Sequence, residues 1–271
     1  MQRFVALDRR WIFLVIGLAV AAPFLFHWAL PVASVSDRTK NVYDYIEAAK
    51  PGDAILISFS YGPAAMPELH PMALAVLRHA LSKDLRVVAM SMSVQGSLMA
   101  DDALAKVAKD FPNKKDGTDF VNLGFKPGGY LVVLGMGDNI PKTYPADSKK
   151  RPLGTLPVMR GLMGLKDLRM VLDLASSRTP DTWILFGHER FKADVALGVT
   201  AVMATDYYPY LSTKQILGLL NGLRGAADYE ALLGRQDNGF LGMTSQSVAH
   251  LLIILFVLLG NIGYFATRKR P

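Results

Sequence analysis

Two long stretches without any charged residue, one at each end, constrain this chain of 271 residues more than any other feature. Residues 11–36 and 238–267 contain no Asp, Glu, Lys or Arg. Each stretch is long enough to cross about 30 Å of hydrocarbon as a helix that rises about 1.5 Å per residue. We therefore expect transmembrane helices at 11–31 and 246–266, with a water-soluble domain at 37–237 between them.

An alternative interpretation treats the first stretch as a cleaved signal peptide, with the small residues of 33–36 as the cleavage zone. The apolar run from Trp11 to Leu30 is, however, longer than the roughly 7–15 residues of a typical signal-peptide core. An uncleaved membrane anchor is therefore the favoured interpretation.

The net charge of +7 is concentrated in the two tails, 1–10 and 267–271. These tails hold six basic residues and one acidic residue, a charge of +5, which leaves +2 for the rest of the chain. Because Lys and Arg beside membrane helices are retained in the cytoplasm, we expect both termini to be cytoplasmic and the domain extracytoplasmic. Because the charge of the domain is nearly balanced, there is no reason to expect nucleic acid as a partner, whereas the lipid bilayer is an expected partner.

The chain has no cysteine, which excludes disulfides and thiol chemistry.

Between the membrane stretches, apolar runs of strand length alternate with segments of helical spacing. Strands are predicted at 53–59, 85–92, 130–135, 168–174 and 197–204. Helices are predicted from 37, from 71, at 99–111, from 179 and at 212–233, the last because Ser212 and Gln215 form a capping box. This alternation is typical of an α/β fold with a mostly parallel, Rossmann-like sheet flanked by helices. The segments 112–129 and 138–160 remain as long loops.

Several short segments carry a resemblance to known sequences. They are Ser60-Tyr-Gly-Pro63, Pro67-Glu-Leu-His-Pro71, Leu77-Arg-His79, Lys126-Pro-Gly-Gly129, and Ala249-His-Leu-Leu-Ile-Ile254 with Gly260-Asn261. In these segments the chain resembles uncharacterised bacterial membrane proteins in which a Rossmann-like domain lies between two terminal transmembrane helices. The resemblance implies the architecture and no particular activity.

Polar residues follow the predicted strands at the edge where open parallel sheets bind ligands. Hydroxyl and carboxylate groups in such positions can orient a small polar ligand. The candidate ligand-binding residues are Ser60, Tyr61, Ser93, Asp138 and Asp206.

Motifs that would indicate a cofactor, a metal or a catalytic centre are incomplete. The segment from Gly135 to Ile140 begins like a dinucleotide fingerprint but lacks its third glycine and the helix that should follow. Glu68 and His70 are two potential metal ligands, which is fewer than a zinc site requires. We therefore expect no catalytic residue, no metal and no cofactor.

Two groups of residues indicate contacts with partners. Tyr207, Tyr208 and Tyr210 offer the aromatic contact area that is enriched at interfaces. In the second membrane helix, Gly260, Asn261 and Gly263 combine small residues with a polar one, as helices that associate in lipid often do. A homo-oligomer or other membrane subunits are the expected protein partners.

These observations leave three hypotheses for function. The leading one is a membrane-anchored, non-enzymatic subunit whose α/β domain serves assembly or interaction in a larger membrane complex. The second is an extracytoplasmic domain that binds or senses a small ligand at the strand ends. The third is a hydrolase that combines Ser60 or Ser93 with His70 and Asp206.

Overall fold

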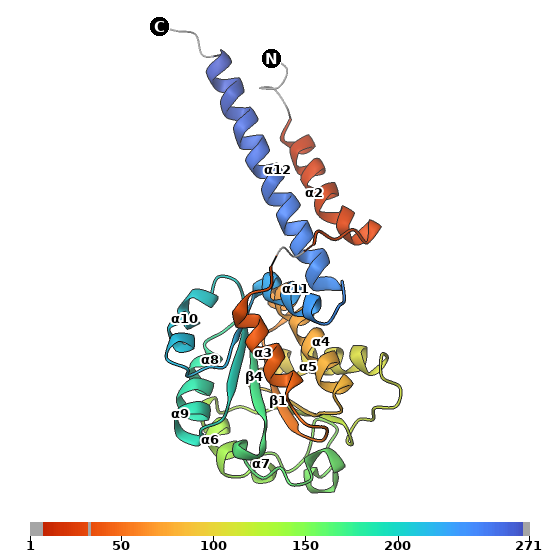
Figure 1. Cartoon of the computed structure of the whole chain (residues 1–271), viewed down its shortest axis with the longest axis vertical. Helices are drawn as coiled ribbons and strands as arrows, with labels where there is room; N and C mark the ends of the chain where they lie inside the picture. The colour runs from red at the N-terminus through yellow and green to blue at the C-terminus, as the bar shows by residue number, and fades with distance from the viewer. Residues whose placement is uncertain (1–7, 32–33, 268–271) are drawn as a thin grey trace.

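The computed structural model describes residues 8–31 and 34–267, and its centre is one six-stranded parallel sheet (Figure 1). The strand order is β3-β2-β1-β4-β5-β6, which is that of a Rossmann fold. The predicted α/β class with a parallel, Rossmann-like sheet is therefore confirmed. The strands are β1 (Ala54–Ser60), β2 (Arg86–Ser91), β3 (Phe120–Phe125), β4 (Met170–Ala175), β5 (Val195–Val199) and β6 (Leu219–Asn221).

Helices cover both faces of the sheet. One face carries α3 (Asp37–Glu47), α4 (Met66–Ser82), α5 (Val94–Ala108) and α11 (Gly222–Leu232). The other carries α6 (Tyr130–Asp138), α7 (Ile140–Thr143), α8 (Thr179–Thr182), the π-helical segment Trp183–His188, α9 (Glu189–Phe191) and α10 (Ala204–Ser212). Because side chains alternate along a strand, β1 sends Ile57 and Phe59 into the first core and Leu56 into the second. Short 3₁₀ turns lie at Pro63–Ala65, Leu153–Thr155, Pro157–Met159 and Leu165–Asp167.

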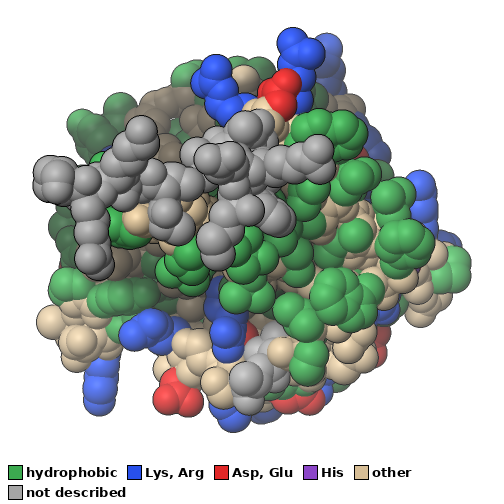
Figure 2. Space-filling model, turned by 90° about the horizontal axis from the view of Figure 1, so that it is seen from above, with side chains coloured by type: hydrophobic (Ala, Val, Ile, Leu, Met, Phe, Trp, Pro, Cys, Tyr) green, Lys and Arg blue, Asp and Glu red, His purple; other side chains and the backbone are tan. Residues whose placement is uncertain are grey.

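Two apolar helices, α2 (Arg9–Phe26) and α12 (Asn238–Thr267), leave the domain together on one side (Figure 1). Both are long and apolar enough to cross a membrane. Few residues of either span are buried inside the structure, so neither is a core helix of the domain. Figure 2 looks down on the molecule from the end that carries these helices and shows hydrophobic side chains over much of that surface. The tail residues 1–7 and 268–271, on which the expected sidedness depends, lie outside the described residues.

Helix α12 begins earlier than the membrane segment predicted at 246–266, because its first two turns pack on α11. Gly239 and Gly242 allow this contact: a Cβ at Gly239 would lie 2.9 Å from Ala226, and one at Gly242 would lie 2.8 Å from Leu223. The buried Glu230 of α11 accepts hydrogen bonds from the backbone N–H groups of Gly239 and Phe240, each at 2.9 Å. These N–H groups would otherwise lack a partner inside the helix.

The strand predicted at 130–135 is wrong, since these residues form α6. Val132, Val133 and Met136 recur at helical spacing and pack against the second face of the sheet. The edge position in the sheet belongs instead to β3, which lies inside the segment predicted as a long loop at 112–129. The glycines at 135 and 137 therefore lie within a helix, whereas the glycines of a dinucleotide fingerprint follow a strand.

The single helix predicted at 212–233 is also wrong. Ser212 ends α10 instead of starting a helix, and Lys214 has a left-handed φ of 61° that the helix could not continue through. Leu219 and Leu220 then pair with β5 and enter opposite cores, so a short strand buries both side chains. Smaller boundary differences affect the helix predicted from 71, the helix at 99–111 and the strand at 197–204, which correspond to α4, α5 and β5.

Candidate functional site

The centre of the sheet, where β1 lies beside β4, is the point at which the strand order reverses and a Rossmann-like fold binds its ligand. A buried polar network occupies the carboxyl ends of these strands. The Ser60 hydroxyl donates to Asp173 Oδ1 at 2.9 Å and lies 3.0 Å from Ser58 Oγ, while Thr179 Oγ1 donates to Asp173 Oδ2 at 2.8 Å. Burial raises the pKa of Asp173 to about 6, although these hydrogen bonds favour its charged form. Ser60 is thus engaged in the interior of the domain.

The other predicted ligand residues are spread over the domain. Ser93 lies at the end of the neighbouring strand β2, where its hydroxyl caps α5 by accepting from the Gly96 N–H at 3.0 Å. Asp206 lies in the first turn of α10 and contacts Arg178 at 3.5 Å. Asp138 ends α6 beside Gly164, which precedes the amino end of β4. The structure brings Ser60, Tyr61 and Ser93 to adjacent strand ends, but it places Asp138 toward the opposite edge.

Tyr61 connects β1 to a second polar group that the sequence did not predict as a site. Its hydroxyl lies 2.9 Å from His70 Nδ1. His70 Nε2 lies 2.9 Å from Asp102 Oδ2, although the two are not aligned as a hydrogen bond, and Lys106 Nζ donates to the same oxygen at 2.6 Å. Burial and the charge of Lys106 lower the pKa of His70, against the opposing effect of Asp102. A neutral ring with its proton on Nε2, facing the carboxylate, leaves Nδ1 to accept from Tyr61.

The residues that a hydrolase would have combined are not assembled. Ser60 contacts Ser58 and Asp173, whereas the two ring nitrogens of His70 face Tyr61 and Asp102. In the described residues 8–31 and 34–267, no group of three or more His, Asp or Glu side chains is placed to hold a metal ion.

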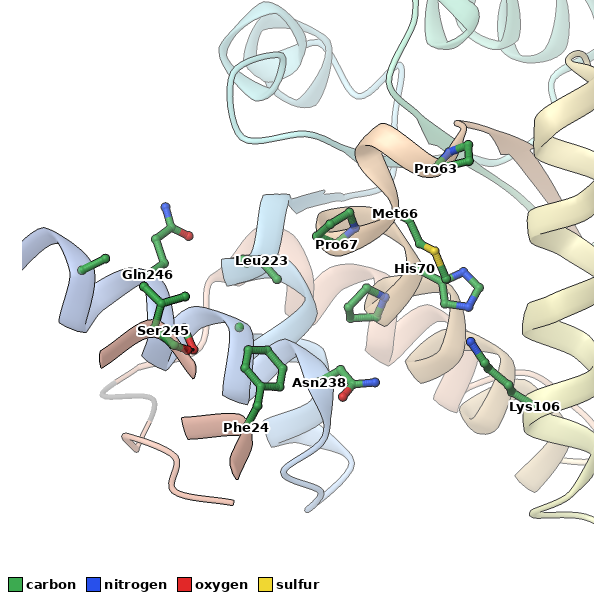
Figure 3. A pocket seen from close by; sticks show the side chains of 14 residues that line it. Phe24, Pro63, Met66, Pro67, His70, Lys106, Leu223, Asn238, Ser245 and Gln246 are labelled. Atoms are coloured by element: carbon green, nitrogen blue, oxygen red, sulfur yellow. The ribbon is translucent and has the colours of Figure 1, made fainter. Parts of the chain in front are cut away.

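A cavity of about 640 Å³ lies at the junction between the domain and the two apolar helices (Figure 3). This volume is within the range that encloses small-molecule ligands. Figure 3 shows His70 and Lys106 on one side and Phe24, Ser245 and Gln246 on the other. The walls are mostly apolar and are formed by Val20, Phe24, Pro63, Met66, Pro67, His70, Pro71, Lys106, Leu223, Asn238, Gly242, Ser245, Gln246 and Ala249.

Local sequence explains how these walls are formed. Pro63 lies at the start of the 3₁₀ turn Pro63–Ala65, and Pro67 lies at the start of α4. At these positions proline costs no helical hydrogen bond. On the other side, the Ser245 hydroxyl donates to the Val20 carbonyl at 2.9 Å and holds α12 against α2. Three segments that carry the resemblance noted from sequence, 60–63, 67–71 and 249–254, each contribute to this cavity. Their separation along the chain hid the site from sequence analysis.

The predicted interface residues have the following places. Tyr207 is buried and donates to Asp181 at 3.2 Å, and the Tyr208 ring lies under Arg38, so these tyrosines pack within the chain. The ring of Tyr210 is tilted against that of Tyr207, with the ring centroids 6.1 Å apart. Gly260, Asn261 and Gly263 lie in the outer half of α12, where Asn261 donates to the Val257 carbonyl at 2.7 Å. Apart from its chain neighbours and the backbone of its own helix, no described atom comes within 4 Å of a Cβ built at Gly260.

Comparison with protein families, with curated proteins and with solved structures finds no match for the chain.

Proposed function

We propose that this chain is a two-pass membrane protein that binds an amphiphilic, lipid-derived molecule at the junction between its α/β domain and its membrane helices. Both termini would be cytoplasmic and the domain extracytoplasmic, as the distribution of basic residues indicates. The observation that carries the proposal is the 640 Å³ cavity, whose walls come from both membrane helices and from the domain.

The cavity combines apolar walls with a few polar groups, as the binding of an amphiphile requires. On the helix side, Val20, Phe24 and Ala249 offer an apolar surface suited to a hydrocarbon chain, beside the polar Ser245 and Gln246. His70 and Lys106 lie at the domain end of the cavity, where the Lys106 ammonium can donate a hydrogen bond to a polar head group. Since Asp102 neutralises Lys106 and His70 is neutral, this end suits a head group of low net charge.

The access route supports a lipid-phase ligand over a water-soluble one. Helices α2 and α12 carry exposed apolar side chains along their length, and the same two helices form one wall of the cavity. A molecule dissolved in the bilayer would reach the cavity between them without crossing water. The expected ligand is therefore a lipid or a lipid precursor, not a nucleotide or a metal.

The test is a cavity-filling substitution with a matched control. Ala249→Phe places a ring in the cavity, whereas Leu251→Phe, two residues away, changes a side chain that is 65% exposed. Native mass spectrometry in mild detergent should detect a retained lipid on the wild type and on Leu251→Phe, and loss of it from Ala249→Phe. A diazirine-labelled fatty acid should crosslink to the peptide that contains Met66 and His70. Equal lipid retention by both variants, with no crosslink to α4, would refute the proposal.

Assembly into a larger membrane complex is the second candidate. The outer half of α12 extends beyond the part that packs on the domain, and most of its large apolar side chains from Leu251 to Phe265 are exposed. Lipid covers such a surface in a monomer, but a second copy or another membrane subunit fits it equally well. The small residues Gly260 and Gly263 would allow close approach of a partner helix.

A further inference from the structure

The α/β domain exposes its large hydrophobic side chains almost entirely at one edge. Eight such residues are exposed within 37–237, and six of them lie at or just beyond the carboxyl ends of β2, β3 and β5. Val202, in the loop after β5, is 86% exposed, and Leu98, in the first turns of α5, is 61% exposed. The full set at this edge is Val94, Leu98, Phe125, Tyr130, Leu131 and Val202, while Met163 and Leu185 lie elsewhere.

This carboxyl edge faces the same side as the two apolar helices (Figure 1). Pro63, three residues beyond β1, lines the same cavity as Val20 of α2 and Ala249 of α12. The loop after β5 joins this edge too, because Glu68 of α4 accepts from the Ala201 N–H at 2.9 Å. The segments that follow β1 and β5 thus lie close to the part of the molecule where the two apolar helices meet the domain.

Several hydrogen bonds fix the domain relative to the helices. The Leu30 N–H donates to Thr244 Oγ1 at 2.9 Å, just after the end of α2. The Ser36 N–H donates to Asp228 Oδ2 at 3.0 Å, which ties the start of α3 to α11. Glu230 of α11 accepts hydrogen bonds from the first turn of α12. The connection from α2 to α3 and the connection from α11 to α12 are therefore both fixed to the domain. The carboxyl edge therefore keeps its orientation toward the helix side.

We propose that the carboxyl edge of the sheet rests on the bilayer surface, with Val202 and Leu98 inserted among the lipid head groups. This inference depends on the part of the proposed function that places α2 and α12 in the membrane. It does not depend on a ligand in the cavity. Apolar side chains exposed in patches mark contacts with a membrane or a protein, and the continuity of this edge with two membrane helices favours lipid. The domain would be held against the membrane and not suspended above it.

The absence of cysteine from the chain permits a direct test. Single variants Val202→Cys and Leu98→Cys are labelled with an environment-sensitive fluorophore, and the full chain is reconstituted into phosphatidylcholine vesicles that contain spin-labelled quencher lipids. Leu258→Cys on α12 serves as the membrane control. Met163→Cys, in the loop before β4 at the opposite edge and 51% exposed, serves as the aqueous control. All variants also carry Trp11→Phe and Trp28→Phe, so that fluorescence from Trp183, which is fully buried, confirms that each variant is folded.

At positions 202 and 98 we expect a blue-shifted emission and a loss of fluorescence to shallow quencher lipids that approaches the loss at position 258. Position 163 should show neither effect. If 258 is quenched while 202 and 98 behave like 163, the inference is overturned and the proposed function stands. A blue shift at 202 without lipid quenching would assign the edge to a protein partner and would also overturn it. If 258 itself escapes quenching, membrane insertion fails and both proposals fall.

Discussion

Replacing Asp173 by Asn should remove a pH dependence from the stability of the α/β domain. Asp173 is fully buried beneath the carboxyl ends of β1 and β4 and receives hydrogen bonds from Ser60 and Thr179. Burial raises its pKa from the ordinary value of 3.8 to about 6. Asn has nearly the same shape and can still accept a hydrogen bond from Thr179, so the substitution removes the titration more than the packing.

The direction in which stability changes with pH follows from proton binding. Between the two pKa values the folded state holds a proton on Asp173 that the unfolded state has lost, so unfolding releases a proton. The contribution of Asp173 to the free energy of unfolding is fully present below the pKa of the unfolded state and is lost as the pH rises through about 6. A shift of about two pKa units corresponds to roughly 3 kcal/mol in all, at about 1.4 kcal/mol per unit, of which about 2 kcal/mol falls between about pH 4.5 and pH 7.5.

The assay is urea unfolding of the full chain in mild detergent, followed by the fluorescence of Trp183. The chain has three tryptophans, and Trp183 is the one within the domain, so Trp11→Phe and Trp28→Phe leave it as the sole reporter. In this background the stability of the wild type should fall by about 2 kcal/mol more than that of Asp173→Asn as the pH rises from about 4.5 to 7.5.

If the free energy of unfolding changed with pH in the same way for the wild type and for Asp173→Asn, the reasoning would be contradicted. They would mean that Asp173 has the same proton affinity in the folded and unfolded states. Thr179→Val is a useful comparison, because it removes one hydrogen bond that favours the charged form and should push the pKa of Asp173 further up. The steep part of the stability curve should then move to higher pH.

Three further predictions use the same protein. Burial also raises the pKa of Glu230, to about 7, so Glu230→Gln should flatten the loss of stability as the pH rises from about 5 to 8, in the same titration. Protease added to intact spheroplasts should digest the chain within 37–237, whereas cleavage only after lysis would reverse the expected sidedness. Cysteines introduced at Gly260, Asn261 and Gly263 should crosslink to another helix if α12 associates in the membrane. Uniform labelling of α12 by a lipid-phase probe, without crosslinks, would make it only an anchor.

The parts of the fold that sequence predicted correctly are those in which burial is uniform. All seven residues of β1 are buried, and the strand begins with the continuous apolar run from Ala54 to Ile57. The missed strand β3 contains Asn122 and Gly124, and its buried Asn122 side chain is satisfied by Asp101 of α5 at 2.8 Å. A polar residue satisfied by a distant partner breaks the apolar pattern from which a buried strand is recognised.

The errors at α6 and β6 have a different origin, which is competition between local and long-range contacts. Val132 and Val133 have side chains that suit a strand, yet the edge of the sheet is already occupied by β3, so they pack onto its face from a helix. Ser212 with Gln215 matches a capping box, but Leu219 and Leu220 gain burial in two cores only as a strand beside β5. Tertiary burial outweighs capping, which is worth about 1 kcal/mol.

Sequence analysis did not find the candidate site because its walls meet only after two separate helix contacts have formed. Tyr61 and His70 are nine residues apart, and their hydrogen bond is local enough to have been suspected. The cavity itself requires α2 to lie against α12, with Val20 bonded to Ser245 across most of the chain, and α12 to lie against α11. Nothing in residue spacing encodes those contacts.

The topology of the sheet places the candidate site on the same side of the domain as the two apolar helices. In an all-parallel sheet every strand ends at one edge, and the helix that follows must return toward the other. Helix α11 makes this return after β6, so the chain comes back to the carboxyl edge only because α12 runs back along α11, with Gly239 at the close contact. Helix α2 meets α12 on that same side. The edge at which parallel sheets bind ligands is therefore the edge turned toward the two apolar helices. If these helices span the bilayer, a ligand reaches the site from the lipid phase, and the hydrophobic residues around the edge meet the membrane surface.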